Sequence, residues 1–151
     1  MIPESSLIKS ETIIRELNSS DEVFMTKKST LRWLALSLGL ISPNETRKFL
    51  FEVFETLIDF HIQKNPPTTR DIVLKLDPDG SKHLEKSIYY HLLRLKNAGI
   101  INRKKSKYYF GDGDEKPLKY LFRVIYTRKL ENAFSIIDSA FDRIEKKGEI
   151  L

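Results

Sequence analysis

The sequence of 151 residues contains no cysteine. Disulfide bonds and cysteine-ligated metal sites are therefore excluded. The longest apolar run, residues 34–41, includes a serine and a glycine and is far too short to cross a bilayer. The first residues also lack a basic region leading into a continuous apolar segment, which is the pattern of a secretory signal. We therefore expect a soluble, cytoplasmic protein with no membrane partner.

Patterns that indicate catalysis or cofactor binding are also missing. The carboxylates are scattered, and no glycine-rich phosphate-binding loop is present. His83 and His91 are eight residues apart, which does not give the i, i+4 geometry of a helical metal pair. We expect no enzymatic activity, no metal and no cofactor.

What the chain does have is an excess of basic residues in its middle. The net charge is +5, and residues 42–113 carry 13 basic against 9 acidic residues, which accounts for most of the excess. Within residues 85–110 there are seven basic residues and a single acid, Glu85. A focused positive charge suits a polyanion, because each neutralised phosphate releases condensed counterions. A solvated surface is the common alternative for a basic cluster of this kind.

The same stretch predicts a helix. Ile88, Leu92 and Leu95 are spaced by four and three residues, which places them on one helical face. Gly99 can adopt the left-handed conformation that ends a helix. Together with the turn signals at residues 77–80, this predicts a helix over roughly residues 81–99.

A hairpin is predicted directly after this helix. Two β-prone runs flank the basic turn Lys104–Lys107, so residues 101–110 should form two antiparallel strands. Thr68 or Thr69 can cap a preceding helix over residues 70–76. The order helix, turn, helix, hairpin is that of a winged helix-turn-helix.

The remaining segments are predicted to be helical. Residues 4–17 carry an apolar stripe, and residues 31–40 are apolar almost all round, so the second of these helices should be largely buried. Ser42 and Glu45 have the spacing of a capping box at the start of a long amphipathic helix, which Pro66 and Pro67 follow.

The C-terminal region, from about residue 117 to 147, has no internal glycine or proline. Its apolar residues recur every three or four positions over a helix of roughly 45 Å, which is longer than one small domain needs. We expect this helix to form a homodimer, and the alternative is that it folds back on the N-terminal helices. The stripe includes Leu118, Phe122, Ile125, Leu130, Ala133, Ile137, Ala140 and Ile144.

These elements predict a mainly α fold with a small β-hairpin. It should consist of an N-terminal helical extension (1–41), a winged helix-turn-helix domain (42–113) and a long C-terminal helix (114–151) that dimerises.

Residues 67–113 resemble the winged-helix transcription regulators of the ArsR, MarR and PadR type. The resemblance rests on Ser87, on His91-Leu92 with Leu95 three residues on, and on Ala98-Gly99-Ile100 entering the first wing strand. Thr69-Arg70-Asp71-Ile72 is similar to the helix that precedes it in those proteins. The turn at Asp77–Leu84 is longer than usual and, with Glu85, is expected to put acids beside the DNA face.

The resemblance implies a DNA-binding regulator whose second helix enters the major groove, where base edges carry a readable pattern. The groove-facing residues would be Lys82, Lys86, Ser87, Tyr90 and Arg94, and the wing would place Arg103, Lys104, Lys105 and Lys107 against the backbone or the minor groove. Of the two tyrosines on this helix, Tyr89 is the one expected to pack into the core.

Three functional hypotheses follow. The first is a dimeric regulator that binds double-stranded DNA. The second is a winged-helix protein–protein interaction module of a larger assembly, because a fold does not fix a function. The third is a binder of RNA or of nucleic acid without sequence preference.

Overall fold

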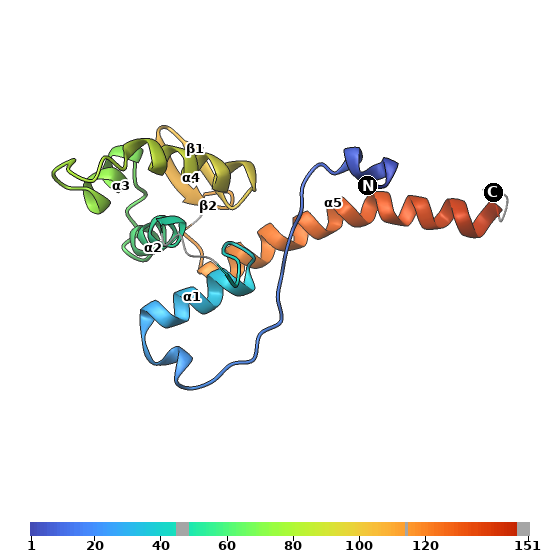
Figure 1. Cartoon of the computed structure of the whole chain (residues 1–151), viewed down its shortest axis with the longest axis horizontal. Helices are drawn as coiled ribbons and strands as arrows, with labels where there is room; N and C mark the ends of the chain where they lie inside the picture. The colour runs from blue at the N-terminus through green and yellow to red at the C-terminus, as the bar shows by residue number, and fades with distance from the viewer. Residues whose placement is uncertain (45–48, 114, 148–151) are drawn as a thin grey trace.

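The computed structural model describes residues 1–44, 49–113 and 115–147 (Figure 1). This part of the chain forms helices and one two-stranded antiparallel sheet, with a long helix at the C-terminal end. The predicted mainly α fold with a small hairpin is therefore confirmed. The elements are η1 (Pro3–Leu7), η2 (Val23–Met25), α1 (Lys27–Ser37), α2 (Phe49–Ile62), α3 (Thr69–Leu76), α4 (Glu85–Asn97), β1 (Ile101–Lys104), β2 (Lys107–Phe110) and α5 (Leu118–Lys147).

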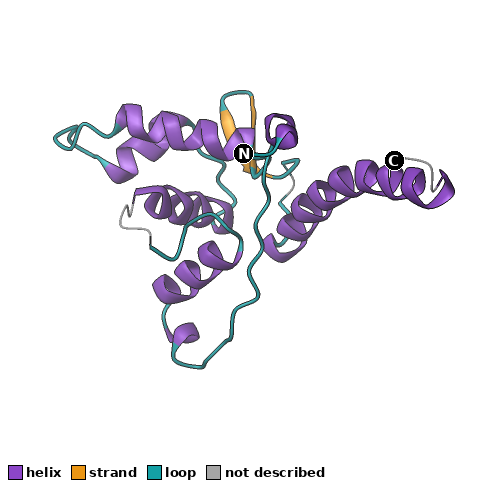
Figure 2. Ribbon diagram, turned by 45° about the vertical axis from the view of Figure 1, so that its right-hand side comes forward, coloured by secondary structure: helices purple, strands orange, loops and turns teal. Residues whose placement is uncertain are grey.

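Helices α2, α3 and α4 and the hairpin enclose the hydrophobic core (Figure 2). Phe54 of α2, Ile72 of α3 and Ile88 of α4 are among its fully buried side chains. In the hairpin, Ile101 pairs with Phe110, and both face this core. The arrangement of helix, turn, helix and hairpin is that of a winged helix.

The local signals for α3 and α4 act as the sequence predicts. Thr68 caps α3 by accepting a hydrogen bond from the Asp71 amide, and the Asp71 carboxylate accepts one from the Thr68 amide. This reciprocal capping satisfies two amides that have no partner within the helix. The predicted inward face of α4 is buried, and Gly99 has the left-handed φ of 77°. Helix α4 begins at Glu85 rather than at residue 81, so Lys82 lies in the preceding loop.

The N-terminal region is not the helix that we predicted for residues 4–17. Only the 3-10 turn η1 forms there, and residues 8–20 run as an extended arm (Figure 1). The arm bonds to the end of α1 instead: the Arg15 amide donates to the Ser37 carbonyl, and the Ser37 hydroxyl donates to the Arg15 carbonyl. A helical stripe stabilises a helix only where it has a core to cover, and Leu7, Ile13 and Ile14 are exposed.

Helix α1 also differs from its prediction. It begins four residues earlier, at Lys27, because the Thr26 side chain accepts a hydrogen bond from the Ser29 amide. Only Leu31 and Ala35 are buried, so the expectation of a largely buried helix is wrong. Residues 45–48 lie outside the described part of the chain, and so does the predicted capping box between Ser42 and Glu45.

The core extends beyond the winged domain in both directions. Leu31 and Ala35 of α1 belong to it, and so do Leu121 and Ile125 of α5. The Tyr126 hydroxyl of α5 donates a hydrogen bond to the Leu38 carbonyl at 2.6 Å, and burial raises the pKa of Tyr126 to about 12. The first turns of α5 are thus part of the domain.

The dimerisation stripe predicted on α5 therefore divides into two parts. Leu118, Phe122 and Ile125 pack against the protein's own core, and they are not a free dimer face as predicted. The sequence prediction included these three residues because the apolar spacing continues without a break from the domain into the projecting half of α5. The other predicted residues are exposed, on the half of α5 that extends away from the domain (Figure 1): Leu130, Ala133, Ile137, Ala140 and Ile144.

Candidate nucleic-acid interface

The surface of α4 opposite its buried face carries both basic and aromatic side chains. Lys86, Ser87 and Arg94 are exposed there, as the sequence predicts. Tyr89 and Tyr90 are 49% and 58% exposed, so the expectation that Tyr89 enters the core is wrong. One residue is a 100° rotation on a helix, and Ile88 alone already occupies the inward position at this level.

Arg94 lies over the ring of Tyr90, with its guanidinium carbon 5.7 Å from the ring centroid. The two residues are four apart on one helix, so they are neighbours on its surface. A guanidinium stacked on a ring keeps its N–H donors at its rim, where they can bond a phosphate or a guanine edge.

The loop before α4 is built around a buried acid. Asp77 is 3% exposed, and its two carboxylate oxygens accept hydrogen bonds from the Lys82 amide at 3.0 Å and the Leu84 amide at 3.2 Å. The prediction that this loop puts acids beside the DNA face is thus wrong for Asp77. Asp79 and Glu85 are exposed. The Lys82 side chain is exposed as well, whereas its backbone amide is held by the hydrogen bond to Asp77.

The wing tip is a two-residue turn. Lys105 and Ser106 both have positive φ, 50° and 69°, which is the conformation of a type I′ hairpin turn. The four pairs from Ile101–Phe110 to Lys104–Lys107 set the register. Because facing residues share a side of the hairpin, Arg103 lies on the same side as Tyr108, with its guanidinium carbon 5.5 Å from the ring centroid.

The four predicted wing cations do not all point to the tip. Lys104 donates a hydrogen bond to the carbonyl of Asp112, which directs its ammonium toward the base of the wing. Lys105 and Lys107 are exposed at the tip and beside it. The four cations therefore separate into a pair at the tip (Lys105 and Lys107), Lys104 at the base of the wing, and Arg103 beside Tyr108.

A groove joins the wing to α4, and it is lined by Tyr89, Tyr90, Leu92, Leu93, Lys96, Arg103 and Tyr108. Leu93 and Lys96 are functional candidates that the sequence prediction missed. The signal for Leu93 was present, because it is a large apolar residue on the face of α4 opposite the buried one. It is 55% exposed.

The wing is held against the domain by several bonds. The Tyr108 amide donates to the Pro67 carbonyl at 2.8 Å, and the Thr69 hydroxyl donates to the Tyr108 hydroxyl at 3.2 Å. At the exit of the hairpin, Arg128 of α5 binds the carboxylate of Asp112. The angle of the wing to α3 and α4 is therefore fixed by α3 on one side and by α5 on the other.

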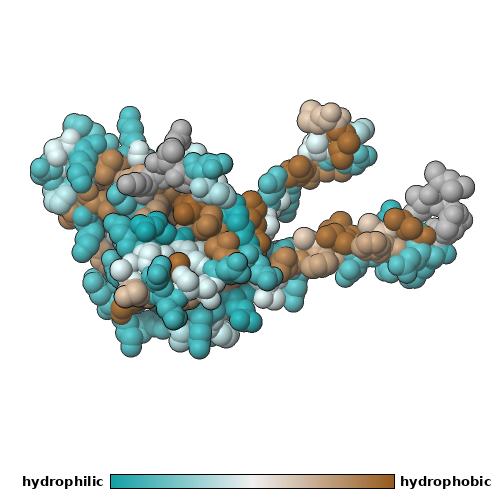
Figure 3. Space-filling view, turned by 60° about the horizontal axis from the view of Figure 1, so that its bottom comes forward, coloured by the Kyte–Doolittle hydropathy of each residue, from teal (hydrophilic) through white to brown (hydrophobic). Residues whose placement is uncertain are grey.

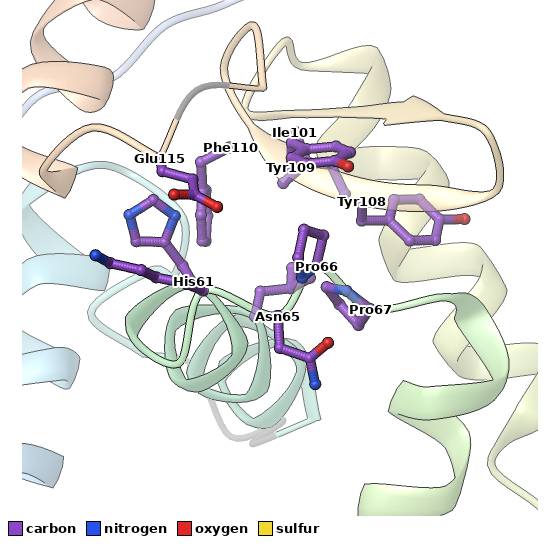
Figure 4. Close-up of a pocket in the computed structure, with 11 residues that line it drawn as sticks. His61, Asn65, Pro66, Pro67, Ile101, Tyr108, Tyr109, Phe110 and Glu115 are labelled. Atoms are coloured by element: carbon purple, nitrogen blue, oxygen red, sulfur yellow. The ribbon is translucent and has the colours of Figure 1, made fainter.

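A small pocket lies behind the wing, between the end of α2 and β2 (Figure 4). Its walls include Pro66, Tyr109 and Glu115, and His61 borders it. The His61 ring packs edge-on against Phe110 at 5.9 Å, and its Nε2 bonds the Lys116 carbonyl at 3.0 Å. His61 thus closes the apolar face of α2, as its spacing from Ile58 suggests.

The chain matches no protein-family model, no characterised protein and no solved structure. Over the described residues, no group of three or more His, Asp or Glu side chains could hold a metal ion. Across the same part of the chain, no helix is long and apolar enough to span a membrane.

Proposed function

We propose that the protein binds double-stranded DNA as a transcription regulator, and that it does so as a homodimer. Helix α4 would enter the major groove, and the wing would contact the backbone. The observation that supports this proposal is the groove between α4 and β1–β2, because it places Arg103 of the wing and the exposed tyrosines of α4 on one surface. Arg94 is stacked on one of those tyrosines.

The chemistry of this surface fits a duplex. Lys86 and Arg94 lie on the helix, and Lys105 and Lys107 lie at the wing tip, so phosphates on both sides of a groove would be within their reach. Ser87 and the tyrosine hydroxyls can bond phosphates or base edges. The inward orientation of Asp77 removes one negative charge from this surface.

The direct experiment is titration of fluorescent duplex DNA with the protein at several salt concentrations. We expect binding at low salt, with the logarithm of affinity falling linearly with the logarithm of salt concentration. Selection from randomised duplexes should enrich a sequence, and a matched RNA duplex should bind more weakly. Undetectable affinity for DNA at low salt would contradict the proposal.

A second function, docking of a protein partner, is favoured by one observation. Leu93 is a large apolar residue at the middle of the same surface and is 55% exposed. Apolar residues of this kind are typical of protein interfaces, whereas phosphate contacts need donors. If Leu93→Asn abolishes a protein complex and leaves DNA affinity unchanged, docking is the better description of the surface.

A further inference from the structure

The outer half of α5, residues 130–144, carries an apolar stripe with a heptad spacing. Its five large members are separated by four, three, four and three residues, and each is between 41% and 60% exposed. These residues are Leu130, Phe134, Ile137, Phe141 and Ile144. Figure 3 shows hydrophobic residues along the projecting helix. A continuous apolar stripe of this kind marks an interaction surface.

The two edges of this stripe differ in charge. One edge carries acids at intervals of seven residues: Glu131, Asp138 and Glu145. On a helical projection the opposite edge carries Ala133 and Ala140, with the bases Lys129 and Arg143 beyond them. In heptad terms the acids occupy the e positions and the alanines the g positions.

The N-terminal segment lines a groove beside this helix. Leu7 at the end of η1 and the polar arm residues Lys9, Ser10 and Thr12 face Leu130, Ala133 and Ile136 of α5 across this groove. Leu7, the last residue of η1, and Ile8, the first residue of the arm, are exposed. Figure 3 shows the arm and α5 projecting from the domain on the same side. Arg15 fixes the root of the arm by donating hydrogen bonds to the carbonyls of Leu36 and Ile41.

We propose that the apolar stripe of α5 packs against the same stripe of a second copy of this chain, as a parallel two-stranded coiled coil. The inference deepens the proposed function, because it gives the geometry of the homodimer on which that function rests.

The charge of the two edges argues for a second copy in the parallel orientation. In a parallel pair related by a two-fold axis, the e edge of each helix faces the g edge of the other. The three acids of one helix would then face the alanines of the other. Because alanine is small, the basic residues beyond the alanines can reach these acids. In an antiparallel pair the e edges face each other, and the three acids of each helix would repel those of its partner.

The length of the stripe explains the role of the arm. Residues 130–144 span about 21 Å, which is two heptads, whereas an independent coiled coil is expected from three or four. Leu7 lines a groove with Leu130 and Ala133, so it adds to the apolar area that the pair buries. A parallel pair also places both winged domains at the same end of the coiled coil, as two half-sites of a palindromic duplex require.

The test uses the absence of cysteine from the chain. Leu130→Cys and Ile144→Cys lie at the two ends of the stripe, at equivalent heptad positions. A parallel pair brings each residue next to its own copy, so each variant should form a covalent dimer on mild oxidation. An antiparallel pair would instead link 130 to 144, and only when the two variants are mixed.

The control variant is Ser139→Cys, on the outward face of the same helix segment, which should stay uncrosslinked. Sedimentation of the unmodified chain should give the mass of a dimer. A monomer at about 100 µM, or crosslinking confined to the mixture of the two variants, would overturn the proposal.

The arm is tested separately. Leu7→Asp with Ile8→Asp should weaken dimerisation at least about 10-fold, because one charge would enter the groove at Leu7 and the second would lie next to it in the sequence. Ser19→Asp with Ser20→Asp adds the same charge farther along the arm and should leave the dimer unchanged. Equal dimer affinity for the two double variants would exclude the arm from the interface.

These outcomes are independent of DNA affinity. A crosslinked parallel dimer that binds no duplex would contradict only the DNA-binding part of the proposed function, and a monomer that binds duplex would contradict only the dimer.

Discussion

The Thr69 hydroxyl, in the first turn of α3, donates a hydrogen bond to the hydroxyl of Tyr108 at 3.2 Å, and both residues are buried. They are 39 positions apart in the sequence, and the bond joins the helix-turn-helix to the second wing strand. Because the Tyr108 amide also donates to the Pro67 carbonyl, this strand is attached to the start of α3 through both its backbone and its side chain.

Tyr108→Phe should lower the free energy of unfolding by about 1 kcal/mol, because the Thr69 hydroxyl would lose its buried partner. Thr69→Val should have a similar cost, and the double variant should cost less than the sum of the two. Urea denaturation measures all three. Tyr109→Phe, on the other side of the same strand, is the control. If Tyr108→Phe is as stable as this control, the bond has no net effect on stability.

The sequence predicted this part of the fold well, for a physical reason. Ile88, Leu92 and Leu95 are spaced for one helical face, and the capping pair Thr68 and Asp71 is a local signal that needs no tertiary contact. Both kinds of signal lie within one helical turn or two, so they are visible in the sequence.

The wrong predictions concern features that depend on contacts between distant parts of the chain or within a loop. The stripe at residues 4–17 has helical spacing, but the chain offers it no core, and Arg15 bonds to the end of α1 instead. Position along the helix alone places Tyr89 in the core, but Ile88 already occupies the inward position there. The inward turn of Asp77 depends on its bonds to amides five and seven residues away, which no spacing rule reveals. DNA binding remains a prediction.

Asp77→Ala should lower the free energy of unfolding by about 1–3 kcal/mol, because two amides in the loop before α4 would lose their acceptor. Hydrogen exchange at the Lys82 and Leu84 amides should become faster in this variant. Asp79→Ala removes a neighbouring acid that is exposed and bonds Ser81, two residues away in the same turn, so it should cost less than Asp77→Ala. Equal stability of the two variants would show that the carboxylate of Asp77 does not hold the loop.

Asp112 gives a prediction about pH. Arg128 donates hydrogen bonds to both of its carboxylate oxygens, at 3.1 and 3.4 Å, which holds the pKa of Asp112 below its ordinary value of 3.8. Because the pKa is lowered in the folded state, the stabilisation from the Asp112–Arg128 ion pair is fully present above pH 3.8. It is lost as the pH falls through the lowered pKa. Carboxyl NMR titration should show this lowered pKa, and Arg128→Gln should raise it. An unchanged pKa in Arg128→Gln would exclude the ion pair as its cause.

Gly39→Ala should detach the arm from α1. A Cβ at this position would lie 2.5 Å from the Ile13 carbonyl oxygen, and the φ of 71° is unfavourable for any other residue. Gly80→Ala is a matched control, because Gly80 has a φ of 72° and no atom within 4 Å of such a Cβ. In both variants the strained backbone should lower the free energy of unfolding by about 1 kcal/mol. Only Gly39→Ala should also speed proteolysis of residues 8–18. Equal proteolysis rates would mean that the arm does not depend on this contact.

The wing gives the most direct test of DNA binding. Arg103→Ala with Lys105→Ala should weaken binding to all duplex sequences alike and should reduce the slope of log affinity against log salt by about 2, because two phosphate contacts are lost. Arg94→Ala should instead cost roughly 1–3 kcal/mol on the selected sequence and little on others, if its guanidinium bonds a base edge. Lys28→Ala with Arg32→Ala on α1 removes the same charge from another exposed surface and should leave the slope nearly unchanged. A slope that changes equally in both double variants would show that net charge, rather than the wing, determines the affinity.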